Sequence, residues 1–277
     1  MENIKEIQWL SSNYLSEEVR IIDCRYKLGE PHYGKALFQE AHIPGAVYFD
    51  LEDDLSGEIE VHGGRHPLPD IDDFVLKVQK AGITNSTKVI AYDSGEGAFA
   101  ARCWWMLKYL GHEEAFILNG GFEAWKNEGF EVTSQITEYP AEKYHPVLQP
   151  DIAASVEDVR EIAAGESEGL LIDSRARDRY LGRYEPIDKV AGHIPGAVNY
   201  EWTDSLKNGS FLSKDDHEKR WSDIEKDETV IVYCGSGVTA AANILSLWTA
   251  GYRNAKLYTG SYSDWVSYKE HSVEKEK

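Results

Sequence analysis

One cysteine stands where a reactive thiol could be held: Cys234 follows the apolar run VIVY and precedes a glycine-rich turn. The turn consists of Gly235, Ser236, Gly237, Val238 and Thr239, small residues whose backbone N–H groups can point inward. Ser236 and Thr239 can add hydroxyl donors. A helix starting near Val238 or Thr239 adds the positive end of its dipole. A cysteine at the base of such an anion cradle is typical of a nucleophile that reacts as the thiolate.

The same cysteine has a structural interpretation, because a cysteine at a strand end is commonly a small buried apolar side chain. A packing cysteine does not need convergent amides, however, so the loop favours the chemical interpretation. Cysteine phosphatases also place a cysteine before a helix, but their Cys-x5-Arg pattern needs an arginine where this chain has Ala240. Without a bidentate cation for the phosphate, phosphoryl transfer is disfavoured.

The elements that must position this loop alternate between strands and helices. Short apolar runs predict buried strands at 20–24, 45–49, 88–92, 114–118, 170–173, 196–200, 229–233 and 255–258. Runs 100–111 and 239–251 predict helices closed by glycine, and Ser155 with Asp158 predicts a capping box. This alternation predicts an α/β fold whose mainly parallel sheets are flanked by helices on both faces. In such folds reactive groups gather beyond the carboxyl ends of the strands, where Cys234 falls.

The chain contains its landmarks twice and in one order. AHIPGAV recurs as GHIPGAV, Asp23 corresponds to Asp173, and NGGFEAW corresponds to TGSYSDW. A repeat of this length predicts a duplicated domain and not a solenoid. We expect a first domain at residues 1–135, a proline-containing linker at 136–152 and a second domain at 153–277.

The first half has Asp93, in YDSGEGA, at the position of Cys234. Core packing would not readily accept a charged side chain. We therefore expect solvent to reach this position in both halves, with a nucleophile in the second half alone.

Composition limits the partners. The 277 residues carry a formal net charge of −19, which disfavours nucleic acid and anionic membrane surfaces and requires a locally positive pocket for an anionic substrate. Three cysteines, none in a CxxC pair, predict neither a disulfide framework nor a metal site. The N-terminus lacks the basic and apolar regions of a signal peptide, and no run approaches the ~20 apolar residues of a membrane span. We expect a soluble, cytoplasmic protein.

The duplicated halves, GHIPGAV, CGSGVTA and NGGFEAW together resemble the two-domain rhodanese superfamily of sulfurtransferases, over nearly the whole chain. The resemblance implies two tandem rhodanese-like domains, of which the N-terminal one is catalytically silent, as Asp93 suits. It also implies that Cys234 takes a sulfane sulfur from a small anionic donor, becomes a persulfide and passes the sulfur to a thiol, thioredoxin or cyanide. No metal, base or nucleotide cofactor is implied.

The stretch SRARDRYLGR could hold the anionic end of the donor. Its arginines are Arg175, Arg177, Arg179 and Arg183. Such a cluster can also be a solvated loop paired with its own acidic residues. Arg179, in RYLG, matches the substrate arginine of the family, and Arg183 is a second candidate. We expect Arg175 to pair with Asp173, which orients the wall of the pocket.

The remaining candidates lie in the HIPGAV copies, in GGRHPLPD and at the other two cysteines. His193, like His42, lies in a copy of HIPGAV, and its presence in both halves predicts a structural role in a turn. Arg65 and His66, in GGRHPLPD, lack a counterpart in the second half and are further candidates for substrate contact across the domain interface. Cys24 and Cys103 are expected to pack in the core.

The motifs that bear on the preferred donor resemble two different types of sulfurtransferase. CGSGVTA resembles 3-mercaptopyruvate sulfurtransferases, whereas RYLG resembles the thiosulfate type. The second substrate arginine of the mercaptopyruvate type is missing before GHIPG, where only Lys189 is near. We therefore expect thiosulfate to be favoured slightly, with activity on both donors. A non-catalytic binding or regulatory module is the alternative, which the retained Cys234 disfavours.

Overall fold

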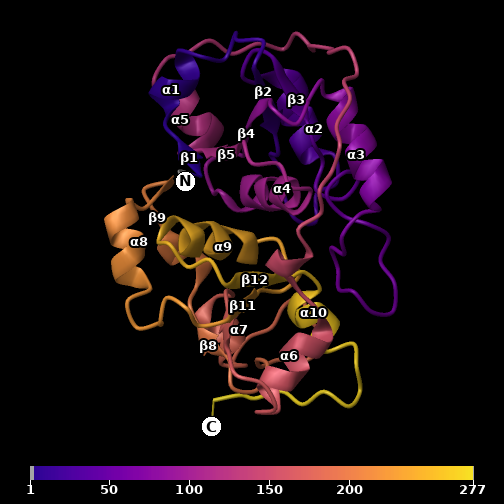
Figure 1. Ribbon diagram of the computed structural model, residues 1–277, viewed down its shortest axis with the longest axis vertical. Helices are drawn as coiled ribbons and strands as arrows, with labels where there is room; N and C mark the ends of the chain where they lie inside the picture. The colour runs from indigo at the N-terminus through magenta and orange to yellow at the C-terminus, as the bar shows by residue number, and fades with distance from the viewer. Residues whose placement is uncertain (1–2, 277) are drawn as a thin grey trace. The chain divides into compact units, whose positions relative to one another are not determined.

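The computed structural model describes residues 3–276 and divides into two compact units, each built around one sheet (Figure 1). The first unit contains the chain up to Gly57, Leu68–Gln149 and Lys207–Phe211. The second contains Glu58–Pro67, Pro150–Leu206 and the chain from Leu212 onward. The segment Glu58–Pro67 therefore belongs to the second unit, although it lies in the first half of the sequence.

The sheet of the first unit has five parallel strands in the order β1-β5-β4-β2-β3. Its strands are β1 (Ile4–Lys5), β2 (Val19–Asp23), β3 (Ala46–Tyr48), β4 (Lys88–Tyr92) and β5 (Ala115–Leu118). Residues of β4 are apolar on both faces, because a parallel sheet covered on both sides buries successive side chains alike.

Five helices flank this sheet: α1 (Ile7–Ser11), α2 (Tyr33–Glu40), α3 (Ile71–Lys80), α4 (Ala98–Tyr109) and α5 (Gly121–Asn127). Alternate strand residues such as Ile21, Ile90 and Leu118 share one apolar cluster with Leu10 of α1 and Trp125 of α5. Helix α4 contacts β4 and β5, and its side chains are almost all buried. Because successive side chains of a strand point to opposite faces of the sheet, the helices that pack on them are divided between its two faces.

The second unit repeats this plan with the parallel strand order β6-β12-β11-β7-β8. Its strands are β6 (Ala153–Ala154), β7 (Leu170–Asp173), β8 (Val198–Asn199), β11 (Val230–Tyr233) and β12 (Ala255–Tyr258). A separate two-stranded sheet pairs β9 (Leu206–Lys207) with β10 (Ser210–Phe211), and all of it except Leu206 belongs to the first unit. All eight strands predicted from the sequence are confirmed, with each end within two residues of its predicted position.

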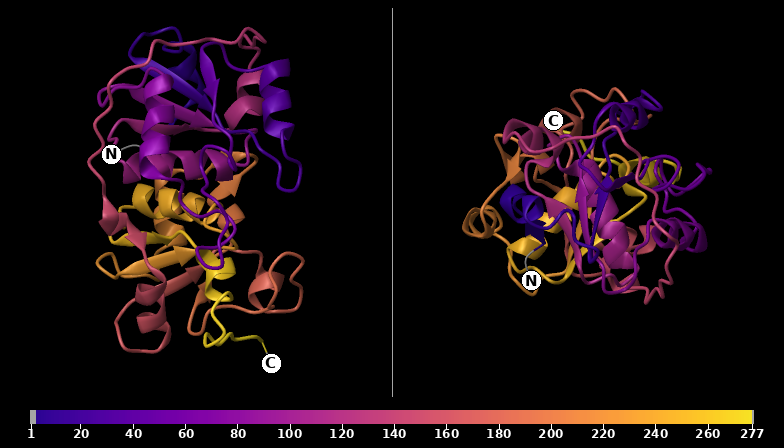
Figure 2. Two further views of the ribbon diagram at one scale, coloured as in Figure 1. Left: turned by 90° about the vertical axis from the view of Figure 1, so that its right-hand side faces the viewer. Right: turned by 90° about the horizontal axis from the view of Figure 1, so that it is seen from above.

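The helices of the second unit are α6 (Val156–Ala163), α7 (Arg177–Tyr180), α8 (Lys214–Arg220), α9 (Ala240–Thr249) and α10 (Ser261–Trp265), with 3-10 turns at Pro150–Ile152 and Trp202–Ser205. Val159 of α6 and Trp265 of α10 pack in one cluster with Ile231. Helix α9 contacts β11 and β12 (Figure 2). This largely buried helix begins immediately after the loop at Cys234, and it therefore holds that loop in place.

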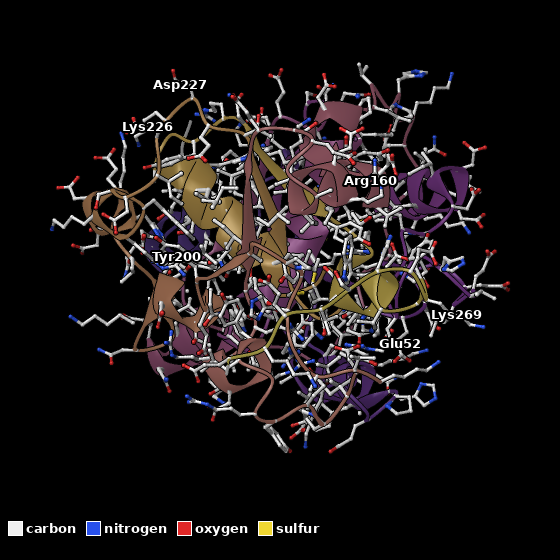
Figure 3. The ribbon with its side chains drawn as sticks, turned by 90° about the horizontal axis from the view of Figure 1, so that it is seen from below. Glu52, Arg160, Tyr200, Lys226, Asp227 and Lys269 are labelled. Atoms are coloured by element: carbon white, nitrogen blue, oxygen red, sulfur yellow. The ribbon has the colours of Figure 1, made fainter. Side chains whose placement is uncertain are left out.

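Helix α6 begins with hydrogen bonds between neighbouring side chains and backbone amides. Ser155 and Asp158 form the predicted capping box before α6, with Oγ of Ser155 accepting from the amide of Asp158 at 3.1 Å. Arg160 of the same helix, labelled in Figure 3, pairs with Glu157 and with Glu166, which lies just beyond the end of the helix. In the part of the chain that the structure describes, the helices are too short or too polar to cross a bilayer.

Candidate active site

Cys234 is fixed at the carboxyl edge of the second sheet. The register of β11 on β7 places Tyr233 beside Asp173, so Cys234 emerges next to Ser174. The backbone N–H of Cys234 donates to Oγ of Ser261 at 3.1 Å, and its carbonyl accepts from the amide of Tyr262 at 3.0 Å. The backbone of Cys234 is therefore anchored at both its N–H and its carbonyl, independently of the contacts of its side chain.

The loop after Cys234 turns an amide toward the sulfur. The N–H of Gly237 donates to Sγ at 3.2 Å. Gly237 has φ +78°, and a Cβ there would collide with the carbonyl of Thr259, so both conformation and space require glycine. Helix α9 begins at Ala240 with Thr239 as its N-cap, just after the predicted start.

Both equivalent positions are buried, so the prediction that solvent reaches them is wrong. Cys234 is 2% exposed and Asp93 is 1% exposed. An amide that contacts sulfur in such a place acts without competition from water, which strengthens its interaction with negative charge.

The segment Glu58–Pro67 is docked on the short helix α10. The amide of Gly63 donates to Oδ1 of Asp264 at 2.7 Å, and the amide of Arg65 donates to Oγ of Ser263 at 3.1 Å. Gly64, at φ +82°, lies so close to Gly260 that a side chain would collide with its carbonyl. These contacts fix the residues that follow.

Arg65 and His66 both reach the cysteine loop. Nδ1 of His66 lies 2.8 Å from Oγ of Ser236, and both side chains are buried. Nη2 of Arg65 lies 2.9 Å from the point where a Cβ on Gly235 would stand. Nη2 and Nη1 of Arg179 lie 3.5 and 3.6 Å from the same point. Two guanidinium groups thus converge beside the residue that follows Cys234.

Carboxylates hold both guanidinium groups. Arg179 donates from Nε and Nη2 to Glu185, at 3.0 and 2.8 Å, and from Nη2 to Oδ2 of Asp188 at 2.9 Å. Arg65 pairs with the other oxygen of Asp188. Arg175 pairs with Asp173 and Glu185, which confirms the predicted ion pair with Asp173.

The predicted positive pocket is therefore electrically balanced by carboxylates of the chain itself. Among the described residues that pair in this cluster, three guanidinium groups (Arg65, Arg175, Arg179) face three carboxylates (Asp173, Glu185, Asp188). A further anion bound in this cluster would give it an excess of negative charge unless one of these carboxylates moved away.

Glu185 and Asp188, the two acidic residues that pair with Arg179, differ in the direction of their pKa shifts. Burial opposes the ionisation of Glu185, yet its hydrogen bonds with Arg179 and with the amides of Asp188 and Ile187 lower its pKa. Burial raises the pKa of Asp188 despite the favourable charges of Arg65 and Arg179. Asp188 is the less well stabilised anion of the two.

The remaining predicted residues lie farther from this cluster or support it. Arg183 pairs with Asp178 and Glu276, and its side chain is 57% exposed. Nδ1 of His193 hydrogen-bonds with the carbonyl of Tyr180 at 2.7 Å, and the two rings stack with centroids 3.9 Å apart. His193 therefore braces α7, which carries Arg179.

In the first unit a carboxylate fills the corresponding loop. Oδ1 of Asp93 accepts from the amides of Gly95 and Gly97 at 3.1 and 2.8 Å, and Oδ2 accepts from Phe99 and Ala100, both at 3.1 Å. Burial raises the pKa of Asp93, and the four amides oppose that shift. The cradle of the first unit thus holds an anion supplied by its own chain.

The rhodanese-like domain family matches residues 6–128 and 155–268. The chain belongs to the rhodanese family. It is 40% identical to a Pseudomonas aeruginosa protein named "Probable 3-mercaptopyruvate sulfurtransferase", covering 94% of this chain and 93% of that one. It is 32% identical to the thiosulfate sulfurtransferase of Mus musculus, covering 93% and 90%. The crystal structure of SseA from Escherichia coli, described as a 3-mercaptopyruvate sulfotransferase, matches with a TM-score of 0.83 and 32% identity over 95% of this chain and 100% of that one.

Sequence reasoning missed three residues at this rhodanese site: Ser261, Glu185 as a buried partner, and Asp188. Ser261 adopts φ +55°, and its counterpart in the first unit is Gly121, at φ +60°. The internal repeat therefore carried a signal for an unusual backbone at Ser261. Asp188 had no such signal, because its partner Arg65 lies 123 residues away in the sequence and becomes a neighbour only after folding. Glu185 follows Arg179 by six residues, so its pairing with arginine could be expected from sequence, but its burial could not.

Proposed function

We propose that the protein is a sulfurtransferase that carries sulfur on Cys234 and that its first unit is catalytically silent. The observation that carries the proposal is the Sγ atom of Cys234, which accepts from the amide of Gly237 at 3.2 Å inside a buried loop. A buried amide directed at sulfur stabilises negative charge on that atom and on a second sulfur attached to it. Asp93 cannot carry sulfur.

In the first half-reaction the thiolate of Cys234 attacks the transferable sulfur of the donor. A sulfur–sulfur bond forms, and the donor's own bond to that sulfur breaks with its electron pair. When thiosulfate is the donor, the leaving group is sulfite. When 3-mercaptopyruvate is the donor, the leaving group is the enolate of pyruvate, which takes up at carbon the proton that the donor thiol loses.

In the second half-reaction a thiophilic acceptor attacks the outer sulfur of the persulfide. The Cys234 thiolate is released and the sulfur leaves on the acceptor, which we propose to be a thiol, thioredoxin or cyanide. The cysteines Cys24, Cys103 and Cys234 are all free thiols. This state suits a reducing compartment, so the cytoplasm belongs to the proposal.

For the donor we propose 3-mercaptopyruvate, in place of the preference for thiosulfate that the sequence favoured. That preference rested on the resemblance of RYLG to the thiosulfate type and on a missing second arginine before His193. Arg65 supplies a second guanidinium group beside Gly235, which removes the second of these reasons. The relative at 40% identity is named for 3-mercaptopyruvate, which supports the same choice.

The test is a mass spectrum of the protein after incubation with each donor and removal of excess. We expect the peptide containing Cys234 to gain one sulfur atom, the Cys234→Ser protein to gain none, and turnover with a common thiol to be faster for 3-mercaptopyruvate. Cys103→Ser is the matched control and should still gain sulfur. Absence of sulfur uptake by the wild type with either donor would instead favour a binding module.

A further inference from the structure

We propose that Asp188 occupies, in the unliganded protein, the position that the carboxylate of the donor takes up during catalysis. This proposal rests on the proposed function and goes beyond it, because it makes Asp188 a residue that determines donor specificity. The occupied position is the bridge between Arg65 and Arg179.

The contacts of Asp188 are those expected of a bound carboxylate ligand. Its Oδ1 pairs with Nη1 of Arg65, and its Oδ2 lies 2.9 Å from Nη2 of Arg179. The side chain is 2% exposed. A planar anion with two oxygens, each on a different guanidinium group, is the arrangement that an α-keto carboxylate would adopt between the same two arginines.

The position is also correctly placed for a donor. The guanidinium groups of Arg65 and Arg179 lie 2.9 to 3.6 Å from where a side chain on Gly235 would begin. Gly235 follows Cys234 directly, so a molecule held by its carboxylate at this bridge lies beside the nucleophile. A small donor such as 3-mercaptopyruvate could therefore present its sulfur toward Sγ.

Asp188 is the exchangeable carboxylate of the cluster. Glu185 accepts from the amides of Ile187 and Asp188, each at 3.0 Å, besides its bonds to arginine. The hydrogen bonds described for the carboxylate of Asp188 come instead from the two guanidinium groups that a donor needs. Exchange would thus replace each ionic contact of Asp188 with an equivalent one from the donor.

The chain around Asp188 is compatible with such an exchange. Residues 183–191 form no helix or strand. Tyr184, Ile187 and Val190 point outward and are 63%, 53% and 37% exposed. The segment is therefore held inward at Asp188 chiefly by ionic contacts, and few apolar contacts would be lost if that residue moved.

The charge balance selects the class of donor. Departure of Asp188 leaves the paired cluster with one uncompensated positive charge, which a monoanionic carboxylate restores to neutrality. A dianion such as thiosulfate would leave an excess negative charge in a buried site, which is unfavourable. The exchange therefore favours an α-keto carboxylate that bears a thiol.

Pyruvate is the probe, because it has the carboxylate of the donor without its sulfur. Removing an internal competitor that fills a site about nine-tenths of the time should tighten binding roughly tenfold. We expect Asp188→Asn to bind pyruvate roughly tenfold more tightly than wild type by calorimetry, and Arg65→Ala to weaken it. Asp178→Asn, which changes an exposed partner of Arg183, is the matched control and should bind as wild type does. Equal or weaker binding by Asp188→Asn would overturn the proposal.

A second measurement needs no variant. Hydrogen exchange of wild-type amides should become faster around residues 185–190 when pyruvate is saturating, because Asp188 leaves its inward position. Unchanged or slower exchange there would also overturn the proposal. Neither experiment depends on sulfur uptake, so a failure of Cys234 to form a persulfide would refute the proposed function without deciding this one.

Discussion

The Oγ atom of Ser236 lies 2.8 Å from Nδ1 of His66, so a side chain from the segment Glu58–Pro67 holds the loop that follows Cys234. Both partners are buried, and replacing either one removes the hydrogen bond between them. We expect His66→Ala to lower kcat/KM for sulfur loading roughly tenfold, equivalent to about 1.4 kcal/mol. Ser236→Ala should cause a similar loss, and the double variant little more.

The control for His66 is His62, which lies on the same segment. Nδ1 of His62 hydrogen-bonds with Oγ of Ser267 at 2.6 Å, and its ring stacks on Tyr268 with centroids 4.0 Å apart. We expect His62→Ala to leave loading near the wild-type rate. If both variants lose activity equally, His66 acts only by docking the segment.

Replacement of Arg179 should separate the two half-reactions. Arg179→Ala removes a charge-assisted contact with the donor, which we expect to cost about 1.5–3 kcal/mol and to lower kcat/KM for loading roughly ten- to a hundredfold. Discharge of the preformed persulfide to a neutral thiol should change much less, because the donor's anion has left. Arg179→Lys should recover only part of the loss, since an ammonium cannot make the two-pronged contact with Glu185. The measurement is rapid-mixing kinetics of each half-reaction.

The exposed Arg177, on the same short helix, provides the control. Arg177→Ala changes the charge of the protein by the same amount and should leave both half-reactions unaltered. Equal slowing of both half-reactions by Arg179→Ala would assign Arg179 to structure.

Introducing a cysteine at Asp93 should not create a second active site. The neighbouring Glu96 is partly buried, and burial together with the charge of Asp93 raises its pKa to about 7. Above that pH its carboxylate repels a thiolate or persulfide in the same loop. We expect Asp93→Cys in a Cys234→Ser background to gain no sulfur from 3-mercaptopyruvate at pH 8, as measured by mass spectrometry. Uptake comparable to that of Cys234 would contradict the asymmetry of the two units.

Glu96 should also make the stability of the first unit depend on pH. Its folded pKa of about 7 lies above the ordinary value of 4.5, so its protonated form is favoured by folding. This contribution is fully present below pH 4.5 and is lost as the pH rises toward 7. We expect Glu96→Gln to raise the free energy of unfolding by about 1–2 kcal/mol at pH 8, after discounting for partial exposure, and to change it little at pH 4.5. Denaturant unfolding at the two pH values measures the difference; a gain of equal size at both would point to packing instead of ionisation.

Local patterns predicted the parts of the fold that depend on neighbouring residues. The strand ending at Tyr233, the turn of glycines and the helix after it are set by side-chain periodicity and by backbone freedom, which can be read directly from the sequence. The ion pair of Arg175 with Asp173 was predicted for the same reason, since the two residues are separated by a single position on the chain.

Contacts between distant segments could not be predicted in this way. Asp188 meets Arg65 across a separation of 123 residues, and His66 meets Ser236 across 170. Composition indicated that an anion needs a positive pocket, but it gave no means to count the carboxylates that fold into the same place. The burial of Cys234 was missed for a related reason: a glycine-rich loop looks exposed until Tyr262 and the segment Glu58–Pro67 are packed around it.

The segment Glu58–Pro67 has a consequence for how this chain could be divided or recombined. A gene fragment encoding residues 153–277 would inherit Cys234, its loop and Arg179. It would leave behind Arg65 and His66, which the compact unit containing Cys234 takes from the first half of the sequence. Such a fragment could keep its sheet while losing a guanidinium group and the imidazole that holds Ser236. Inheritance of the whole proposed site therefore requires both halves of the duplication, even though one of them has Asp93 in place of the cysteine.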